Sequence, residues 1–277
     1  MARPSVSVPA AARAALVAAV AAALPVGCAS SGGHAPPGAG GRWLDLTHVY
    51  DETTVVWPTS ELFDHEMLSA GYNPKGYYYS SARFCTAEHG GTHIDAPVHF
   101  AEGHWSLDEI PLDRLIGPAA VIDVRAACAA DPDYQVSVDD FTAWEAEHGR
   151  LPDGCLVLLD TDFAARWPDA ASYLGTAERG AEAVAKLHFP GLHPDAAAWL
   201  VAERDIHAIG LDTASIDFGQ STHYESHVTL FMADIPAFEN VGDMSELPPW
   251  GAFVAALPMK IGEGTGGPLR VAAWVPD

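Results

Sequence analysis

The sequence predicts one α/β domain at residues 43–277, preceded by an export signal at residues 1–27 and a flexible linker at residues 28–42. Short apolar runs alternate with helical patterns along the domain, and no repeat of fixed period is visible. The chain has 277 residues, 49% of them hydrophobic, which is enough for a sizeable buried core. Strands that alternate with helices are typical of the α/β class.

Six runs have the length and the β-branched content of strands. They occupy residues 43–47, 77–84, 119–124, 156–159, 206–211 and 269–275. Between them, Ser137 and Asp140 form a capping-box pattern, which predicts a helix through Trp144 that ends at Gly149. Pro194 suits a first helical turn and predicts a second helix, at residues 194–202.

The first residues predict export. Arg3 and Arg13 precede an uncharged run at residues 14–26, which is too short to span a bilayer about 30 Å thick and is typical of a secretory signal. Cys28 follows Leu-Pro-Val-Gly, which resembles the lipobox of bacterial lipoproteins; simple cleavage nearby is the alternative. We therefore expect a cell-envelope lipoprotein or a secreted or periplasmic protein, with membrane contact only through an N-terminal lipid anchor.

Charge and cysteine content exclude several classes of protein. The 37 acidic and 14 basic residues give a net charge of −23, so the chain would repel nucleic acid and an anionic membrane surface. Besides Cys28 the chain has Cys85, Cys128 and Cys155, and no C-x-x-C spacing occurs. This pattern indicates neither a disulfide framework nor a thiolate zinc site, and we expect the three cysteines to be small apolar core residues.

Four candidate metal or proton-transfer groups fall within eleven residues: His89, His93, Asp95 and His99. The glycines at 90 and 91 and the proline at 97 argue against a continuous helix and favour a tight loop entering an extended stretch. Alternate side chains of such a stretch share a face, so His93 and Asp95 point the same way, and the glycine turn can bring His89 to join them. Two imidazoles and a carboxylate suit Zn²⁺ or Mn²⁺.

A second polar segment, residues 210–217, follows a predicted strand and leads to His223, His227 and Glu239. Loops at strand ends are where α/β proteins build their sites. His227 and Glu239 can complete the coordination, with Glu239 or Asp95 bridging two ions about 3.5–4 Å apart. His223 is interpreted as a loop histidine outside the metal site.

Two other patterns do not predict function. Residues 262–267 fit G-x-G-x-x-G, but Pro268 and a predicted strand follow where a dinucleotide-binding turn needs a helix, so we expect a glycine-rich turn. No G-x-S-x-G nucleophile elbow occurs, and a serine hydrolase has no support.

The segment from His89 to Phe100 resembles the H-x-G-T-H-x-D-x-P-x-H signature of the cyclase-like family of metal-dependent hydrolases, which includes bacterial kynurenine formamidase and isatin hydrolase. A looser resemblance extends over residues 43–274. It implies a single compact α/β domain with a mixed, barrel-like β core flanked by helices. It also implies a homodimer or a higher homo-oligomer.

The resemblance also implies roles for individual residues. His89 and His93 would bind one metal, Asp95 would bind or bridge two, and His227 and Glu239 would close the second site. His99 would transfer the proton, and Trp57 would contact the substrate, although from the residues alone a tryptophan is more often a packing residue. Where the family often has Gly-Asp after its Trp-Pro, this chain has Thr59-Ser60.

The chemistry expected of these residues is hydrolysis of a formamide, lactam or related cyclic amide by water activated by one or two divalent ions, Zn²⁺ or Mn²⁺. His99 would act as general acid and base on a small-molecule substrate. A lactone hydrolase or a polyketide-type cyclase is the alternative among enzymes. An exported protein that binds metal or ligand without turnover is the alternative outside them.

Overall fold

The computed structural model describes residues 40–277. The predicted signal at residues 1–27, Cys28 and nearly all of the predicted linker lie outside the described residues. The first element of the described chain is strand β1, Gly41–Asp45. Within residues 40–277, no helix combines the length and apolar character needed to cross a membrane.

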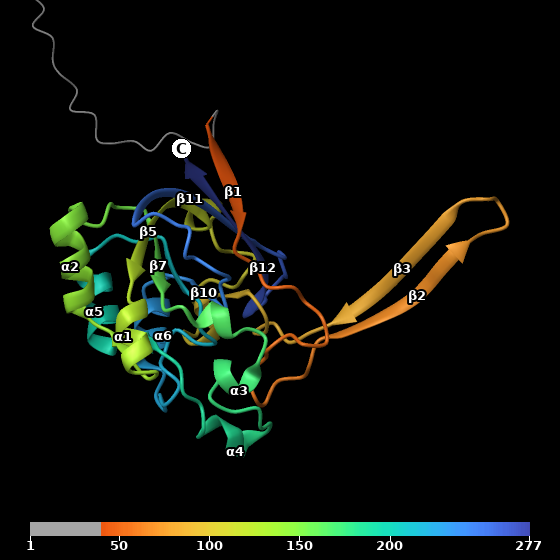
Figure 1. The fold of residues 1–277 in the computed structure, drawn as a ribbon, viewed down its shortest axis with the longest axis horizontal. Helices are drawn as coiled ribbons and strands as arrows, with labels where there is room; N and C mark the ends of the chain where they lie inside the picture. Colours follow the sequence, from red (N-terminus) through yellow and green to blue (C-terminus); the bar gives the residue numbers. More distant parts are fainter. Residues whose placement is uncertain (1–39) are drawn as a thin grey trace, which may run out of the picture. The chain divides into compact units, whose positions relative to one another are not determined.

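Seven strands close into a barrel-like sheet, and β1 pairs with one of them, β12, outside the closed ring (Figure 1). Around the ring the order is β12-β11-β5-β7-β9-β10-β4, and β4 pairs with β12 to complete it. Strands β5, β7, β9 and β10 are parallel neighbours, whereas the other pairs are antiparallel. The bounds are β4 His93–Asp95, β5 Ile116–Asp123, β7 Leu156–Asp160, β9 Ala208–Leu211, β10 Ala237–Glu239, β11 Trp250–Pro258 and β12 Gly266–Pro276.

The helices connect the parallel strands, and Figure 1 shows α1, α2, α5 and α6 grouped on one side of β5 and β7. The helices are α1 Arg125–Ala130, α2 Val138–His148, α3 Ala170–Tyr173, α4 Ala181–Val184, α5 Pro194–Glu203 and α6 Glu225–Phe231. Short 3₁₀ turns span Pro97–His99, Leu112–Arg114 and Phe163–Arg166. Two minor sheets pair β2 (Asp64–Tyr72) with β3 (Tyr78–Cys85) and β6 (Gln135–Val136) with β8 (Gly191–Leu192).

The core has two parts, one on each face of the barrel wall. Along β7, Leu156 and Leu158 belong to one buried cluster, whereas Val157 and Leu159 belong to the other. This alternation follows from the two-residue period of a strand. The second of these clusters also contains helix residues such as Phe141 of α2, so it lies between sheet and helices. The mixed, barrel-like α/β architecture implied by the family resemblance is therefore confirmed.

The predicted elements are found with shifted ends, and some elements escaped prediction. All six predicted strands are present, and α2 has the predicted capping box at Ser137. The missed strand β11 (Trp250–Pro258) is rich in alanine, which has weak β preference, and its pairing with β5 and β12 overrides that preference. Residues 262–265 form the expected turn, and strand β12 follows.

One prediction about the cysteines is wrong. Cys128 and Cys155 are buried as expected, but Cys85 is exposed. Cys85 ends β3, which within residues 40–277 pairs only with β2 in a two-stranded sheet and has no second layer of those residues over it. Figure 1 shows this β2–β3 hairpin extending away from the barrel. All nine residues of β2 are exposed.

Candidate metal centre

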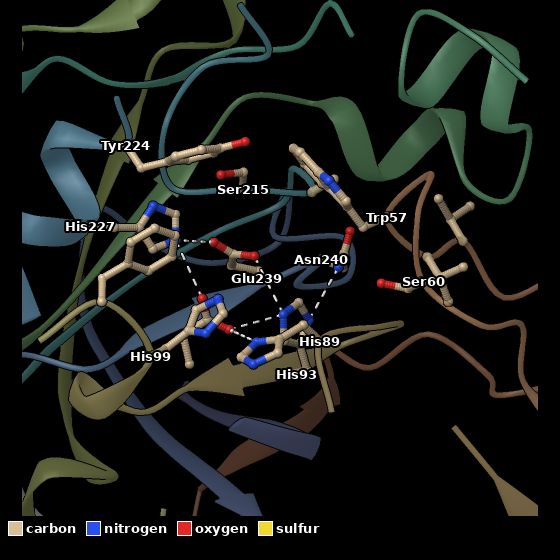
Figure 2. A pocket seen from close by; sticks show the side chains of 15 residues that line it. Trp57, Ser60, His89, His93, His99, Ser215, Tyr224, His227, Glu239 and Asn240 are labelled. Carbon is tan, nitrogen blue, oxygen red and sulfur yellow. Dashed lines mark hydrogen bonds and ion pairs between the residues drawn. The ribbon is translucent and has the colours of Figure 1, made fainter. Parts of the chain in front are cut away.

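A cavity of about 290 Å³ brings together all the residues to which the sequence assigned a chemical role. Figure 2 shows the cavity from close by, with imidazoles and a carboxylate grouped on one wall and Trp57 on the opposite wall. Its lining residues are Val55, Val56, Trp57, Ser60, His89, His93, Asp95, His99, Phe100, Ala214, Ser215, Tyr224, His227, Glu239 and Asn240. The exposed His223 is not among them, as predicted.

A tight turn carries the first segment into the cavity wall. Gly91 has a φ of +60°, and a Cβ there would lie 2.6 Å from the ring of Tyr50, so only glycine fits. The Tyr50 hydroxyl donates to the carbonyls of Gly90 at 2.7 Å and Thr92 at 2.5 Å. The chain then enters β4, whose short run of three residues places His93 and Asp95 on the same face, as the sequence predicted.

Strand pairing and one helix bring the second segment to the first. In the antiparallel pair of β4 and β10, Glu239 lies directly opposite His93, so their side chains share a face. His227 lies on α6 and is buried against the same group. Residues separated by more than 130 positions thus meet around one point.

The donor atoms lie close together. The Nε2 atom of His93 is 3.1 Å from Asp95 Oδ1 and 3.4 Å from Glu239 Oε2. The Nε2 atom of His227 is 3.1 Å from Glu239 Oε1 and 3.3 Å from Asp95 Oδ2. His89 reaches Asp95 Oδ1 with Nδ1 at 2.7 Å. Asp95 is therefore the shared neighbour of all three histidines.

The electrostatics of this group fit a bound cation. Asp95 and Glu239 are both buried, and burial together with the neighbouring Asp95 carboxylate raises the pKa of Glu239. Burial opposes ionisation of Asp95 too, but the imidazoles of His89, His227 and His93 hold its pKa well below the ordinary value. Two buried acids side by side need positive charge, which a divalent ion supplies.

Ligand geometry supports the same conclusion. His93 Nε2 is buried and has no hydrogen-bond partner among the described residues, although it faces two carboxylates. Ligand atoms of His93, Asp95 and Glu239 lie within 4.8 Å of one another, as do those of His89, Asp95 and His99. The first group combines residues from both predicted segments. A site of histidine nitrogens and carboxylate oxygens suits a divalent metal.

Two residues that sequence reasoning left without a role orient the histidines. Asp217, which is 2% exposed, accepts a hydrogen bond from His227 Nδ1 at 2.6 Å. This bond fixes the proton on Nδ1 and turns Nε2 toward Asp95 and Glu239. The His93 ring donates from Nδ1 to the Gly91 carbonyl at 2.9 Å, and the Asn240 amide donates to the same carbonyl at 2.7 Å.

The remaining predicted residues stand at the edge of the charged group. The His99 ring stacks on His89 with a centroid separation of 3.8 Å, and burial lowers the pKa of His99 to about 4. Trp57 lines the cavity and also packs edge-on against Phe189, with ring centroids 6.4 Å apart. Thr59-Ser60 shape the adjoining loop, where Ser60 lines the cavity and its carbonyl accepts a hydrogen bond from Arg179.

Removing the carboxylate that orients His227 should weaken metal binding without removing a predicted ligand. We expect Asp217→Asn to bind Mn²⁺ or Zn²⁺ about 10–100-fold more weakly, because the amide no longer favours the tautomer that leaves Nε2 free. Isothermal titration of metal into the metal-free chain measures this. Asp133→Asn is the matched control, since Asp133 pairs with the exposed His188 Nδ1 at 2.7 Å. Equal affinities of the two variants would contradict the role of Asp217.

Comparison with known proteins agrees with this geometry. Residues 44–218 match the family model described as "Putative cyclase". The chain is 34% identical over 213 residues to isatin hydrolase of Roseibium aggregatum, covering 74% of this chain and 78% of that one. It is 27% identical over 233 residues to kynurenine formamidase of Salinibacter ruber, covering 82% and 94%.

Solved structures give the same result. Isatin hydrolase A from Labrenzia aggregata, bound to benzyl benzoate, superposes with a TM-score of 0.77 at 34% identity and covers 86% of this chain and 94% of that one. An isatin hydrolase bound to the product analogue thioisatinate gives a TM-score of 0.75 at 31% identity, with 86% and 93% covered. The chain therefore belongs to the cyclase family of metal-dependent hydrolases.

Proposed function

We propose that the protein is an amidohydrolase that opens a small formamide, lactam or related cyclic amide with water, at one or two divalent ions. The observation that carries this proposal is the convergence of His89, His93, Asp95, His227 and Glu239 on one wall of a cavity of about 290 Å³. Relatives named isatin hydrolase and kynurenine formamidase support the same reaction class, which is hydrolysis of a non-peptide carbon–nitrogen bond.

His93, Asp95 and Glu239 would hold one ion, while His89 and His227, which both reach Asp95, would complete the ligand set. A divalent ion bound by these residues would lower the pKa of water toward about 7 and would polarise a carbonyl group. Zn²⁺ and Mn²⁺ both accept this mixture of imidazole and carboxylate ligands.

His99 is proposed as the residue that moves the proton. Because burial lowers the pKa of His99 to about 4, its imidazole is neutral near pH 7 and can accept a proton from water. The same ring, once protonated, can return that proton to the departing nitrogen. Its position supports this role, since it lines the cavity and stacks directly on His89.

The other walls of the cavity support a flat, largely apolar substrate. Trp57, Phe100 and Tyr224 present aromatic surface, and Val55 and Val56 add aliphatic surface. Aromatic walls favour stacked or edge-on rings, so we propose that Trp57 contacts the substrate ring. Ser215 also lines the cavity, and its hydroxyl can orient polar atoms of the substrate.

The location of the enzyme is part of the proposal. The charged and apolar pattern of residues 1–27, together with Cys28, supports export and either a lipid anchor or cleavage. An enzyme outside the cytoplasm would meet amides taken from the surroundings rather than those made in cytoplasmic metabolism.

Assays of the metal-loaded full chain on isatin, formylkynurenine, simple cyclic imides and lactones test the reaction. We expect turnover of at least one amide, loss of that turnover with chelator, and recovery when Mn²⁺ or Zn²⁺ is restored. The reason is that the proposed reaction uses water activated by a divalent ion bound at Asp95 and Glu239. Product analysis separates ring opening from ring closure. Turnover of lactones alone would contradict the amide hydrolase and indicate a lactone hydrolase. Metal binding without any turnover would indicate a non-catalytic binding protein.

Substitution of His99 tests the proton-transfer role. We expect His99→Ala to lower kcat about 100-fold to 10,000-fold on an accepted substrate, the usual effect of losing a general acid and base. Metal content, measured on the same samples, should stay near that of the wild type. His223→Ala, a change at an exposed histidine outside the cavity, is the matched control. Wild-type turnover by metal-loaded His99→Ala would rule the role out.

Metal uptake should depend on pH. Burial opposes protonation of His227 and His93, but Asp217 and Asp95 raise the pKa of His227 well above its ordinary value, and Asp95 raises that of His93. A cation must displace these protons, so affinity should fall as pH falls, about tenfold per pH unit for each proton released. Titration calorimetry at pH 6 and pH 8, in buffers of different ionisation enthalpy, measures both the metal affinity and the number of protons released on binding. A pH-independent affinity would contradict this view of the site.

A further inference from the structure

The glycine-rich turn at residues 262–267, for which the sequence predicted no function, packs against the first histidine of the candidate metal centre. A Cβ at Gly266 would lie 2.6 Å from Cε1 and 3.0 Å from Nδ1 of His89, so a larger residue at 266 would collide with the ring. The register of β12 and β4 places Gly266 directly opposite Asp95. Glycine at position 266 therefore leaves the space that the His89 ring occupies.

Within this turn, the side chain of Thr265 connects His89 to Glu88, an acid that does not line the cavity. The Nε2 atom of His89 is 2.9 Å from the Thr265 hydroxyl oxygen. That hydroxyl donates to Glu88 Oε2 at 2.6 Å, and the Thr265 backbone N–H donates to the same oxygen at 3.0 Å. The Thr265 carbonyl accepts from the backbone N–H of Ala96 at 2.9 Å, which fixes the residue from its other side. The hydroxyl is thus held between a carboxylate and an imidazole.

The order of donors and acceptors along these contacts decides where a proton of His89 lies. A hydroxyl has one hydrogen and an ionised carboxylate can only accept, so the hydroxyl hydrogen of Thr265 points to Glu88. The Thr265 oxygen can then only accept from His89, which places a proton on Nε2. The other ring nitrogen, Nδ1, lies 2.7 Å from Asp95 Oδ1 and faces the acids of the site. Nδ1 is therefore the nitrogen that can bind a cation.

We propose that Glu88 and Thr265 are positioning residues that keep a proton of His89 on Nε2, so that His89 binds the metal through Nδ1. The inference rests on the metal centre of the proposed function and adds to it two residues that do not line the cavity. A hydroxyl alone can either donate or accept, and Glu88 removes that choice. Partners of this kind fix both the proton and the plane of a histidine that binds metal.

The other histidines of the site support this role. His93 and His227 each donate from the nitrogen that faces away from the acids, one to a backbone carbonyl and the other to a buried carboxylate. Thr265 gives His89 the equivalent partner. The ring of His99 stacks on His89 with centroids 3.8 Å apart and planes 19° apart, so a rotation of the His89 ring would also change the surface on which His99 lies.

Calorimetric titration of Mn²⁺ and of Zn²⁺ into the metal-free full chain tests the inference without a substrate. We expect Thr265→Val to bind each ion about 10–100-fold more weakly, because valine keeps the branched shape of threonine but cannot accept from Nε2. The net charge is unchanged, so a loss of negative charge cannot explain a weaker affinity. Thr265→Ser restores the hydroxyl and should recover most of the affinity.

Thr47→Val is the matched control. Thr47 is also half-buried, and its hydroxyl bonds to the backbone of Val271 in β12, with contacts of 2.9 Å and 3.2 Å. This variant should keep the wild-type affinity. Circular dichroism verifies that each variant is folded, and Glu88→Gln replaces Thr265→Val if the latter does not fold. An equal loss of affinity in Thr47→Val would overturn the positioning role, because the loss of any half-buried hydroxyl would then have the same effect.

Long-range proton–nitrogen NMR spectra of the Zn²⁺-loaded chain identify the nitrogen of His89 that binds the metal. The expected result is ligation through Nδ1 with the proton on Nε2, and the spectrum of His89→Gln assigns the signals. Ligation through Nε2 would overturn the inference, and so would wild-type affinity in Thr265→Val.

Neither measurement uses a substrate, so the inference and the proposed reaction can fail separately. Metal binding that depends on Thr265 without any turnover would overturn the reaction and support the inference. Turnover by a chain whose metal affinity does not depend on Thr265 would overturn the inference and support the reaction. A wild-type chain that binds neither ion would overturn both.

Discussion

The structure depends on the burial of two carboxylates, Asp95 and Glu239, within reach of the same imidazoles. Two acids in a water-poor environment are unfavourable unless positive charge is held between or beside them. The three histidines supply part of that charge when protonated, and a divalent ion supplies it without a proton. Burying the two carboxylates side by side costs free energy in the metal-free protein, and the same burial gives the site its affinity for a cation.

Closure of the barrel is what puts the acids together. Strand β4 has only three residues, yet it pairs with β10 on one side and with β12 on the other. Ile94, between His93 and Asp95, is fully buried in the barrel core. Because neighbouring residues of a strand point to opposite faces, anchoring Ile94 inside directs its two neighbours into the cavity. The stability of the fold and the position of the ligands thus rest on the same three residues.

A chain of contacts joins the β2–β3 hairpin to the candidate metal centre. Phe63, which precedes β2, packs against Phe84 of β3 and against Tyr50, with ring centroids 6.1 Å and 5.7 Å apart. The Tyr50 hydroxyl in turn holds the Gly90 and Thr92 carbonyls on either side of the Gly91 turn. The hairpin is therefore connected by packing and hydrogen bonds to the loop that carries His89 and leads to His93.

The sequence by itself determined the α/β class, six strands, two helices with their start signals, and the set of chemical groups, because these follow from local periodicity and from residue types crowded within a few positions. It singled out His89, His93, Asp95 and His99 within eleven residues and His227 and Glu239 after the second polar segment, and family resemblance added Trp57. Only the tertiary structure decided that Glu239 faces His93 across a strand pair and that Asp217 and Asn240 hold the ligands in place. It also decided that Cys85 is exposed and that α6 and the alanine-rich β11 form at all. The physical reason is that these features arise from pairing and packing between distant segments, which no local pattern of residues encodes.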